Sequence, residues 1–481
     1  VHWFTDDPVT VFRTGLHVNA VLGGIAAWLL YRLTRKVTNL GVLAAAASAL
    51  TATLLPAVLF TTSFWWSEAL VQPLFLATVL AVIGFVDTSS FRAGALAAIA
   101  ACGAFAAHSR MLPLALVVVA AVIVVWRRRR VTTRVAFGVI GVVAVGFVAV
   151  TWYSEWIIER VWNRPFERNS YGGVAKQLLK VDDMAVAAAG QVWSQLVVTG
   201  GLVGLGTITA VRRALTGDRR WLTILACTAP LVGLSIVFMA DRWRSDQIVY
   251  ERYNDAVVAP LVVLGIATIV GVVGRTVPWR RVLIDAAAVA AVLAATGAVL
   301  HGLRDEALSA ADSVRQMIIG LLAFLGRPRG IDVASVTLRA LGLLAVVAVA
   351  TAIRRSRAAV VVFVVFAAIL TVGFVRTDEV INGNRNGWRV MAAAQQLDDG
   401  TLPRDAPVSF YLKAGSNATS LLMALQFYLP THQFTIVDDF DRDGLERFVF
   451  APLSATQLAD LGAELVWESP WQPVGLWELP G

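Results

Sequence analysis

The 481-residue sequence has little charge and almost no cysteine. Charged residues make up 15% of the chain, hydrophobic residues make up 57%, and the mean hydropathy is +0.69. Both cysteines, Cys102 and Cys227, lie in apolar runs, so the sequence indicates neither a disulfide framework nor a thiolate zinc site. It also lacks a phosphate-binding Gly-Lys-Ser/Thr loop and a paired-histidine zinc motif, which argues against an ATP-driven pump and a zinc protease.

The positive charge of the chain is concentrated in alternate loops between apolar runs. The net charge of +8 comes from 41 basic and 33 acidic residues, and in a soluble domain it would suggest nucleic acid. In membrane proteins, loops rich in arginine face the cytoplasm. The positive charge of this chain therefore indicates which loops lie on the cytoplasmic side of a membrane. These loops are residues 32–36, 127–134, 212–220, 275–281 and 354–357. The other loops carry acids and aromatics and are predicted to face outward.

About a dozen apolar runs are candidates for membrane spans, each of which takes about 20 residues of helix. The predicted spans are residues 11–33, 40–60, 67–85, 94–107, 112–126, 135–152, 184–211, 221–240, 256–273, 283–301, 338–353 and 360–374. Alternation places both chain ends outside, in a multi-pass protein of the plasma membrane. The fourth and fifth spans are short and meet at His108-Ser109-Arg110, which predicts a bent pair with a costly arginine at membrane depth or at the interface.

The last part of the chain is predicted to be a separate domain. Hydropathy falls from Arg376 onward, which predicts an outer domain over residues 376–481 after a membrane domain over residues 1–375. The predicted strands are residues 408–412, 434–437, 448–451, 464–467 and 475–479, and the predicted helices are residues 417–428 and 455–461. We therefore expect an all-α polytopic membrane bundle with a small C-terminal extracytoplasmic α/β domain.

Short motifs occur in a characteristic order along the apolar part of the chain. They are Thr5-Asp6-Asp7-Pro8 followed by His17-Val18-Asn19, then Ser67-Glu68-Ala69-Leu70, then Tyr250-Glu251-Arg252-Tyr253. In this order they resemble the GT-C superfamily of integral membrane glycosyltransferases, which use polyprenyl-phosphate sugars. Within that superfamily, the motifs and their order most resemble those of the protein O-mannosyltransferase-like branch of actinobacteria, glycosyltransferase family 39.

The resemblance covers about residues 1–375 and implies several properties. It implies inversion at the anomeric carbon, transfer of a hexose or pentose, and a divalent cation, Mg or Mn, in some members. The acceptor would be a glycan, lipid or protein of the cell envelope. It also implies a cytoplasmic start and an odd number of spans, so one helix and a first acidic outer loop would lie upstream of Val1.

The chemistry of such a transfer sets three requirements. No nucleotide sugar is available outside the cell, so the donor sugar must arrive attached to a lipid. The site then needs a carboxylate to take the acceptor proton, a metal ion or arginine to stabilise the departing phosphate, and an apolar groove for the isoprenoid tail.

Glu68 is the candidate catalytic residue. It follows Phe64-Trp65-Trp66-Ser67 at the predicted outer end of a span, where a lipid-linked sugar would lie. It would serve as the base or as a metal ligand. The structural alternative is that an acid in the first turn complements the helix dipole, with Ser63 or Ser67 as the cap.

Arg252, flanked by Tyr250 and Tyr253, is the candidate phosphate-binding residue, because a guanidinium group meets phosphate oxygens in a planar, bidentate fashion. Arg110, with His108 nearby, is a second candidate for the phosphate. The alternative for Arg252 is a solvated salt-bridge network that caps two helices. The other charged residues of that loop are Asp241, Arg242, Arg244, Asp246, Glu251 and Asp255.

Asp6, Asp7 and Asp246 are candidate acids or metal ligands. Asp6 and Asp7 precede Pro8, which favours an N-terminal turn over a metal-binding pair.

Four other segments have a structural interpretation that is favoured over a functional one. Residues 153–183 favour an amphipathic helix on the membrane surface, and residues 317–325 an interfacial patch. Gly415-Ser416-Asn417 would cap a helix rather than bind an anion. Asn382 and the asparagines that follow it come after the last span. They are interpreted as a polar segment where the chain leaves the membrane rather than as a glycan-binding site.

We thus predict a glycosyltransferase whose partners are a polyprenyl-phosphate sugar, an extracytoplasmic acceptor and membrane lipid, without nucleic acid. Two alternatives remain open. A transporter or flippase for a lipid-linked sugar would share the groove, but it should carry functional charge on both sides and in the middle of several helices. A catalytically inactive scaffold would bind an envelope enzyme through the outer domain.

Overall fold

The computed structural model describes residues 8–55, 58–59, 67–162, 176–240, 248–249, 252–273, 276–309, 330–353, 356–383, 394–403, 406–411, 422, 425, 428–429, 431–469 and 473–480. The chain divides into two compact units. One comprises residues 15–151 and 169–380, and the other comprises residues 1–14, 152–168 and 381–481. The division predicted at residues 375 and 376 falls within one continuous helix, α17, and remains a prediction.

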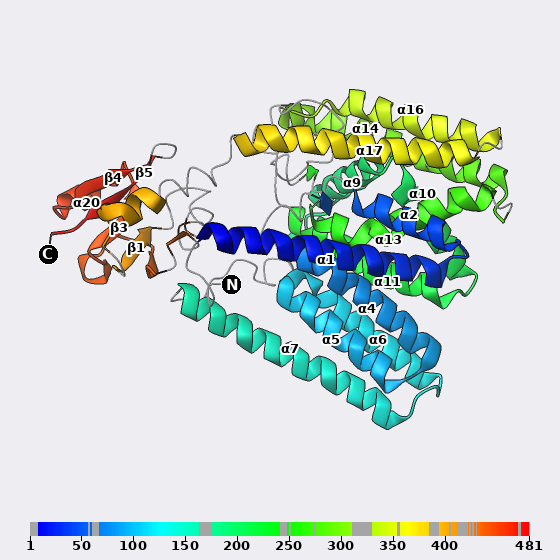
Figure 1. Ribbon diagram of the computed structural model, residues 1–481, viewed down its shortest axis with the longest axis horizontal. Helices are drawn as coiled ribbons and strands as arrows, with labels where there is room; N and C mark the ends of the chain where they lie inside the picture. Colours follow the sequence, from blue (N-terminus) through cyan, green and yellow to red (C-terminus); the bar gives the residue numbers. More distant parts are fainter. Residues whose placement is uncertain are drawn as a thin grey trace. The chain divides into compact units, whose positions relative to one another are not determined.

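Long helices make up the membrane part of the chain (Figure 1). In chain order they are α1 (Pro8–Val37), α2 (Val42–Thr53), α4 (Glu68–Thr88), α5 (Phe91–Ala107), η1 (Ser109–Met111), α6 (Leu112–Arg127), α7 (Thr133–Trp162), α9 (Val181–Val198), α10 (Leu202–Leu215), α11 (Arg219–Met239), α13 (Arg252–Val273), α14 (Trp279–Ser309), α16 (Val333–Ala352) and α17 (Ser356–Gly383).

Among the described residues, eight helices are long and apolar enough to cross a membrane, or nine if a bent pair counts as one span. Three shorter apolar helices, Val42–Thr53, Phe91–Ala107 and Val360–Gly373, fall in three further predicted spans. Every predicted span therefore contains apolar helix. The expected polytopic all-α bundle is confirmed, and the protein is a multi-pass membrane protein.

One predicted span is not a single helix. The run at residues 184–211 is divided between α9 and α10, whose axes differ by 108°. Gly200 and Gly201 at the break have positive φ values of 55° and 81°, which glycine adopts without a steric penalty. The Thr199 hydroxyl donates to the carbonyl of Gln195 and accepts from the amide of Val203, so it bonds to both helices. The apolar run is thus a bent pair of helices rather than one continuous helix, which its unbroken hydropathy does not reveal.

A second correction concerns the segment after Trp152. The sequence favoured a separate amphipathic helix within residues 153–183, whereas α7 continues without a break to Trp162. Its 30 residues correspond to about 45 Å of helix. The polar residues from Glu155 onward therefore extend a spanning helix. Residues 163–175 and the apolar patch at residues 317–325 lie outside the described residues.

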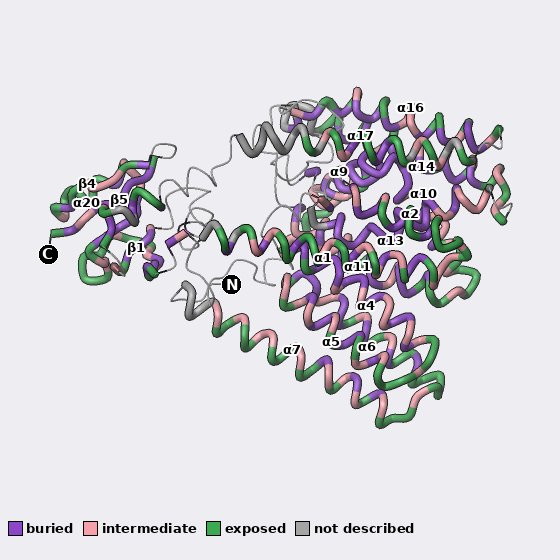
Figure 2. The backbone as a smooth tube through the Cα atoms, viewed as in Figure 1, coloured by how far each residue is buried: buried purple, intermediate pink, exposed green. Residues whose placement is uncertain are grey.

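The helices differ in how deeply they are buried (Figure 2). In the most apolar 18 residues of the span Asn254–Val272 on α13, 78% of the residues are buried. The corresponding share for Thr133–Ile157 on α7 is 17%. Among the candidate spans of the described residues, the one on α13 has the largest buried share, and α10 packs along α13. Gly206 of α10 faces the Leu261 carbonyl so closely that a Cβ atom would overlap it, and Gly265 of α13 faces the Leu202 carbonyl in the same way.

Several arginine-rich loops meet at one end of this helical unit. Asp87, at the end of α4, forms ion pairs with Lys36 at 3.3 Å and with Arg220 at 3.5 Å. Arg130 donates to the carbonyl of Val86 at 2.9 Å. The loops after α1, α4, α6 and α10 therefore share one rim, as alternating spans require. We call Lys36, Asp87, Arg130 and Arg220 the arginine rim.

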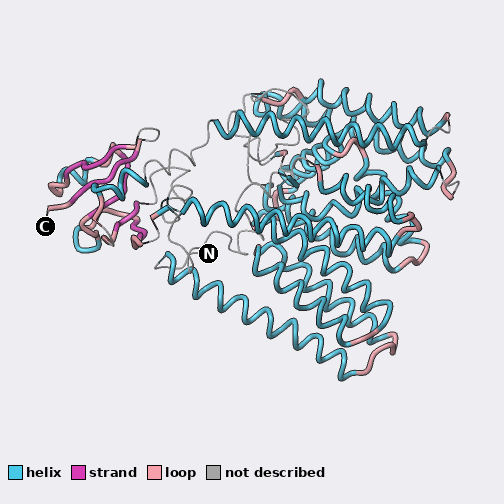
Figure 3. The backbone as a smooth tube through the Cα atoms, viewed as in Figure 1, coloured by secondary structure: helices cyan, strands magenta, loops and turns pink. Residues whose placement is uncertain are grey.

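A mixed sheet forms the core of the C-terminal part (Figure 3). Its strands are β1 (Val408–Tyr411), β2 (Phe434–Val437), β3 (Phe448–Pro452), β4 (Glu464–Glu468) and β5 (Val474–Glu478). Their order is β2-β1-β3-β5-β4, with β1 parallel to β2 and β3 and with β5 antiparallel to its neighbours. The other elements are η3 (Leu397–Thr401), η4 (Arg442–Gly444) and α20 (Thr456–Asp460).

All five predicted strands and the helix at residues 455–461 are confirmed, with ends shifted by at most one residue. Of the predicted helix at residues 417–428, the described positions Leu422, Leu425 and Tyr428 are helical. The two leucines pack with Phe410 and Phe450 in one hydrophobic cluster. Val449 and Trp477 pack with Leu458 of α20 in a second cluster. The small α/β domain is therefore confirmed.

Candidate functional site

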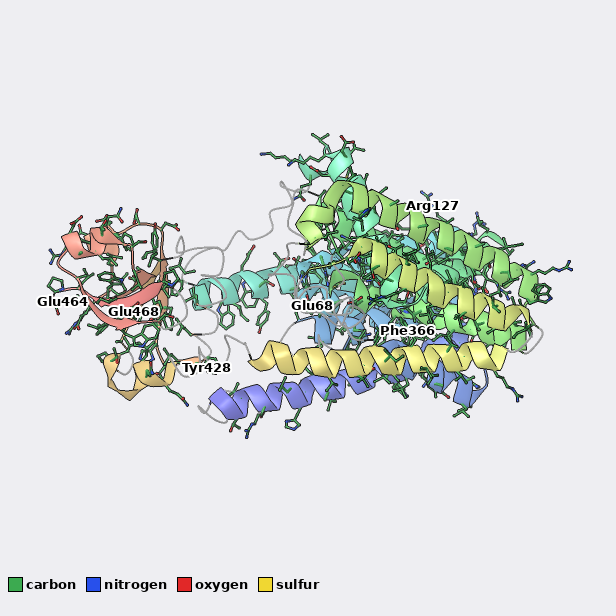
Figure 4. The ribbon with its side chains drawn as sticks, turned by 90° about the horizontal axis from the view of Figure 1, so that it is seen from above. Glu68, Arg127, Phe366, Tyr428, Glu464 and Glu468 are labelled. Atoms are coloured by element: carbon green, nitrogen blue, oxygen red, sulfur yellow. The ribbon has the colours of Figure 1, made fainter. Side chains whose placement is uncertain are left out.

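Glu68 is the first residue of α4 and is almost fully buried, with 1% of its surface exposed. Figure 4 labels Glu68 and Arg127, which lie apart within the helical unit. The structural alternative was that Glu68 simply begins a helix capped by Ser63 or Ser67. The Ser67 side chain makes no capping hydrogen bond, so it does not support that alternative. A carboxylate at this depth is costly unless charged or polar groups compensate it, which distinguishes Glu68 from an ordinary acid at an exposed helix start.

Arg110 is also buried, with 4% of its surface exposed. It lies in η1, the single turn that joins α5 to α6, where the predicted bent pair is confirmed. The His108 ring accepts a hydrogen bond from the backbone amide of Arg110 at 3.4 Å and so helps to shape this turn. Arg110 is therefore held at depth by a tight connection between two helices.

Two polar side-chain pairs join α9 to α13 inside the bundle. The Gln195 amide donates to Oδ1 of Asp255 at 2.9 Å, and the Asn254 amide donates to Oε1 of Gln191 at 2.9 Å. Each of the four residues is at least 94% buried. Gln191 and Gln195 are four residues apart, so they lie on one face of α9. Asn254 and Asp255 are adjacent in the first turn of α13.

Arg110 and Asp255 come together from distant parts of the chain. The Arg110 guanidinium acts electrostatically on the Asp255 carboxylate, which also accepts the hydrogen bond from Gln195. An opposite charge and a hydrogen bond are the two interactions that make a buried carboxylate tolerable. The buried Asp255 carboxylate is thus compensated by one hydrogen bond and by the charge of a buried guanidinium group.

An apolar cavity of about 680 Å³ adjoins these polar pairs. Gln191, Gln195 and Asn254 contribute to its lining, and the other lining residues are almost all aliphatic residues from α9, α10, α11, α13 and α14. The volume is in the range of sites that bind small ligands. A cavity with apolar walls and a few polar groups suits a ligand with a hydrocarbon part and a polar part.

The structure describes the side chains of only some of the predicted site residues. Glu68 and Arg110 are both buried in the helical unit. Arg252 and Tyr253 begin α13, directly before Asn254 and Asp255, but their side chains are not described. The remaining candidates lie outside the described residues; they are Asp6, Asp7, Asp246, Tyr250, residues 384–393 and Gly415-Ser416-Asn417.

A metal ion has no obvious place among the described residues. No group of three or more His, Cys, Asp or Glu side chains lies close enough there to hold one. Three of the predicted ligands, Asp6, Asp7 and Asp246, belong to segments that are not described. The expectation of Mg or Mn therefore remains untested.

The sequence did not single out Gln191, Gln195, Asn254 or Asp255 as site residues. A signal was available, because Gln191 and Gln195 are polar residues at helical spacing within an apolar span. Asp255 was grouped with the charged residues of a solvated loop. Its burial follows from where α13 begins, at Arg252, four residues before the predicted start of that span.

No protein-family model and no curated protein matches the sequence. Two solved structures of ArnT from Cupriavidus metallidurans, a GT-C family glycosyltransferase, are similar in fold. The structure bound to undecaprenyl phosphate has a TM-score of 0.52 and 14% sequence identity. The apo structure has a TM-score of 0.51 and 16% identity. Each match covers 96% of this chain and 83% of the ArnT chain. The chain therefore shares its fold with ArnT, which agrees with the fold that the sequence resemblance implied.

Proposed function

We propose that this protein transfers a hexose or pentose from a polyprenyl-phosphate carrier to an extracytoplasmic acceptor of the cell envelope. The observation that carries the proposal is an apolar cavity lined in part by Gln195, which donates a hydrogen bond to the buried Asp255 carboxylate. The buried Arg110 guanidinium acts electrostatically on that carboxylate. The fold supports the proposal, because ArnT has the same fold and binds undecaprenyl phosphate.

In the proposed reaction an acceptor hydroxyl attacks the anomeric carbon of the donor sugar. The bond between that carbon and the phosphate oxygen breaks, and the electron pair leaves with the polyprenyl phosphate. Glu68 takes the acceptor proton, while arginine stabilises the departing phosphate. Arg110 and Arg252 are the two arginines that we assign to the phosphate, and the aliphatic cavity would hold the first part of the isoprenoid tail.

Asp255 has a supporting role in this proposal. A guanidinium group at membrane depth is stabilised by a nearby carboxylate, which also restricts where the guanidinium can lie. Gln195 in turn fixes one oxygen of Asp255 at 2.9 Å. We assign Asp255 and Gln195 to the positioning of Arg110, and we assign proton transfer to Glu68.

A transporter or flippase for a lipid-linked sugar is the second candidate. The observation that favours it is the broken span, since interrupted helices with polar residues near the break are common at transporter binding sites. Gln195 lies only four residues before Thr199 at the break. A transporter would move the intact lipid-linked sugar between leaflets, whereas a transferase would consume it.

A transfer assay with the purified full-length chain in lipid vesicles tests the proposal. Polyprenyl phosphate carrying radiolabelled mannose, glucose or arabinose serves as donor, with envelope lipid extract as the acceptor source. We expect the wild-type protein to release polyprenyl phosphate and label the acceptor. Because each group acts at the reacting centre, Glu68→Gln and Arg110→Gln should each lower the rate by about a hundredfold or more.

The matched controls are Asp87→Asn and Arg134→Gln, which remove a carboxylate at the arginine rim and an exposed guanidinium at the start of α7. Both should keep the wild-type rate. Movement of intact donor between leaflets without release of polyprenyl phosphate would favour the transporter. Wild-type rates in both Glu68→Gln and Arg110→Gln would show that the proposed site is wrong.

A further inference from the structure

Four polar side chains form a compact group between α9 and α13. Gln191 and Gln195 lie one helical turn apart on α9, and Asn254 and Asp255 are neighbours on α13. The Gln195–Asp255 and Asn254–Gln191 hydrogen bonds, both 2.9 Å, join them across the helices. We call these four residues the amide–carboxylate quartet.

Each member of the quartet has one polar atom whose hydrogen-bonding capacity is unused. Within the described part of the chain, Nε2 of Gln191, Oε1 of Gln195, Oδ1 of Asn254 and Oδ2 of Asp255 are buried without a hydrogen-bond partner. Buried polar atoms are almost always paired in native proteins, and leaving one unpaired is costly. Four unpaired atoms on adjacent side chains indicate a site for a polar group that is not part of the described protein.

The quartet has access to a space that a ligand could occupy. Gln191, Gln195 and Asn254 line the apolar cavity of about 680 Å³. Asp255, the fourth member, is held by Gln195 at 2.9 Å, so the whole quartet adjoins this cavity. Nearly all the other lining residues are aliphatic, which makes the quartet the main source of polar contacts for a ligand there.

The hydrogen-bonding character of the quartet distinguishes between kinds of ligand. Three of its unpaired atoms are acceptors and one is a donor. If the amides of Gln191 and Asn254 are both flipped, the Asn254–Gln191 bond is kept and the balance remains three acceptors to one donor. Gln195 cannot flip without losing its bond to Asp255. A ligand must therefore offer mainly donors.

A phosphate group does not meet this requirement, because its ionised oxygens only accept hydrogen bonds. A sugar hydroxyl both donates and accepts, and a sugar ring carries several hydroxyls at fixed angles. We therefore propose that the quartet binds the hydroxyl groups of the sugar attached to the polyprenyl phosphate, and that the arginines bind the phosphate. This inference rests on the proposed function.

A binding experiment with two probes separates sugar recognition from lipid recognition. The probes are polyprenyl-phosphate mannose and sugar-free polyprenyl phosphate of the same chain length. The variant is Gln191→Met combined with Asn254→Leu, because replacing both partners of a hydrogen bond by apolar side chains of similar size leaves no new unpaired group. Dissociation constants are measured for the full chain in nanodiscs by quenching of tryptophan fluorescence.

We expect the double variant to bind the sugar-bearing probe about tenfold more weakly than the wild-type protein does, the loss expected for one or two hydrogen bonds. Its affinity for the sugar-free probe should be unchanged. The matched control is Thr351→Val on α16, which alters a buried polar residue outside the cavity lining whose hydroxyl already donates to the Val347 carbonyl. The control should bind both probes as the wild-type protein does.

The possible failures differ in pattern. Equal weakening for the two probes, or unchanged affinity for both, would overturn the assignment of the quartet to the sugar while leaving the proposed function standing. A lower melting temperature of the double variant with unchanged affinities would mean that buried water satisfies these atoms. A wild-type protein that binds neither probe would overturn the proposed function, and the quartet assignment with it.

Discussion

Charged side chains inside the bundle are the informative residues of this protein. Glu68, Arg110, Asp255 and Asp285 are each at least 94% buried within a chain that is only 15% charged. Charge at membrane depth is expensive and marks either a structural pair or a site. Asp285 belongs to the first class, because Arg212 binds both of its carboxylate oxygens, at 2.7 and 3.0 Å. We assign Arg110 and Asp255 to the second class, because the hydrogen-bond partner of Asp255, Gln195, lines a cavity.

The Arg110–Asp255 interaction should be measurable as an energetic coupling. Single and double variants with Arg110→Met and Asp255→Leu form a double-mutant cycle on the free energy of unfolding in mixed micelles. Because either single variant leaves one buried charge without its counter-charge, we expect a coupling energy of about 1–3 kcal/mol. Two changes that simply add, with no coupling, would contradict the pairing.

The Arg212–Asp285 pair gives a second prediction. Arg212→Gln should lower the free energy of unfolding by roughly 1–3 kcal/mol, because the buried Asp285 carboxylate loses its charged donor. The cost is moderated because the Arg212 side chain is 42% exposed and water reaches the pair. Arg213→Gln on the next residue, which has no ion pair among the described residues, should change stability little. Equal effects of the two substitutions would contradict a structural role for the pair.

The sequence identified part of the candidate site. Glu68 and Arg110 stood out because each is a charged residue at the edge of an apolar run. Charge at such a position is costly in a membrane and therefore points to a function. The quartet was missed because Gln191 and Gln195 lower the mean hydropathy of their span only slightly, and because pairing across helices depends on how α9 and α13 pack. Sequence periodicity shows which residues share one face of a helix, but it does not show which other helix packs against that face.

At the scale of elements, local patterns predicted the C-terminal strands well and one membrane helix poorly. The strands are short β-branched and aromatic runs bounded by turn residues, so each boundary has a local cause. The bend between α9 and α10 also has a local cause, the Gly200-Gly201 pair, but hydropathy averaged over a span conceals it. The order of the strands depends on long-range pairing and was not predicted.

The close contact of α10 with α13 gives a prediction at this scale. Gly206→Ala should destabilise the protein by about 1–3 kcal/mol, because the added methyl group would overlap the Leu261 carbonyl and push the helices apart. The matched control is Gly342→Ala on α16, where a Cβ atom meets nothing within 4 Å and the helix should tolerate or favour alanine. Melting temperatures in detergent measure both. A Gly206→Ala variant as stable as the control would contradict the close packing.

At the scale of the whole molecule, the account depends on which rim faces which compartment. Asp87 links Lys36 and Arg220 at one rim, as the positive-inside rule requires for loops on a single side. The loops that carry acids and aromatics then face outward, where only a lipid-linked donor is available. This orientation is a prediction from the sequence.

Cysteine accessibility tests this orientation. In a background with Cys102→Ala and Cys227→Ala, single cysteines replace Arg128, which is exposed after α6, and Asp460, which is exposed at the end of α20. A membrane-impermeant maleimide should label the Asp460→Cys variant in intact cells. It should label the Arg128→Cys variant only after the membrane is opened. The reverse pattern would place the proposed site in the cytoplasm and remove the reason for a lipid-linked donor.

The most direct measurement is a cryo-electron microscopy structure of the protein in nanodiscs loaded with polyprenyl phosphate. We predict that the phosphate lies within hydrogen-bonding distance of the Arg110 guanidinium and that the first isoprene units occupy the cavity lined by α9, α10, α11, α13 and α14. A lipid phosphate bound away from Arg110, with the cavity filled by a helix or side chains, would contradict the central claim that this cavity presents a lipid-linked sugar for transfer.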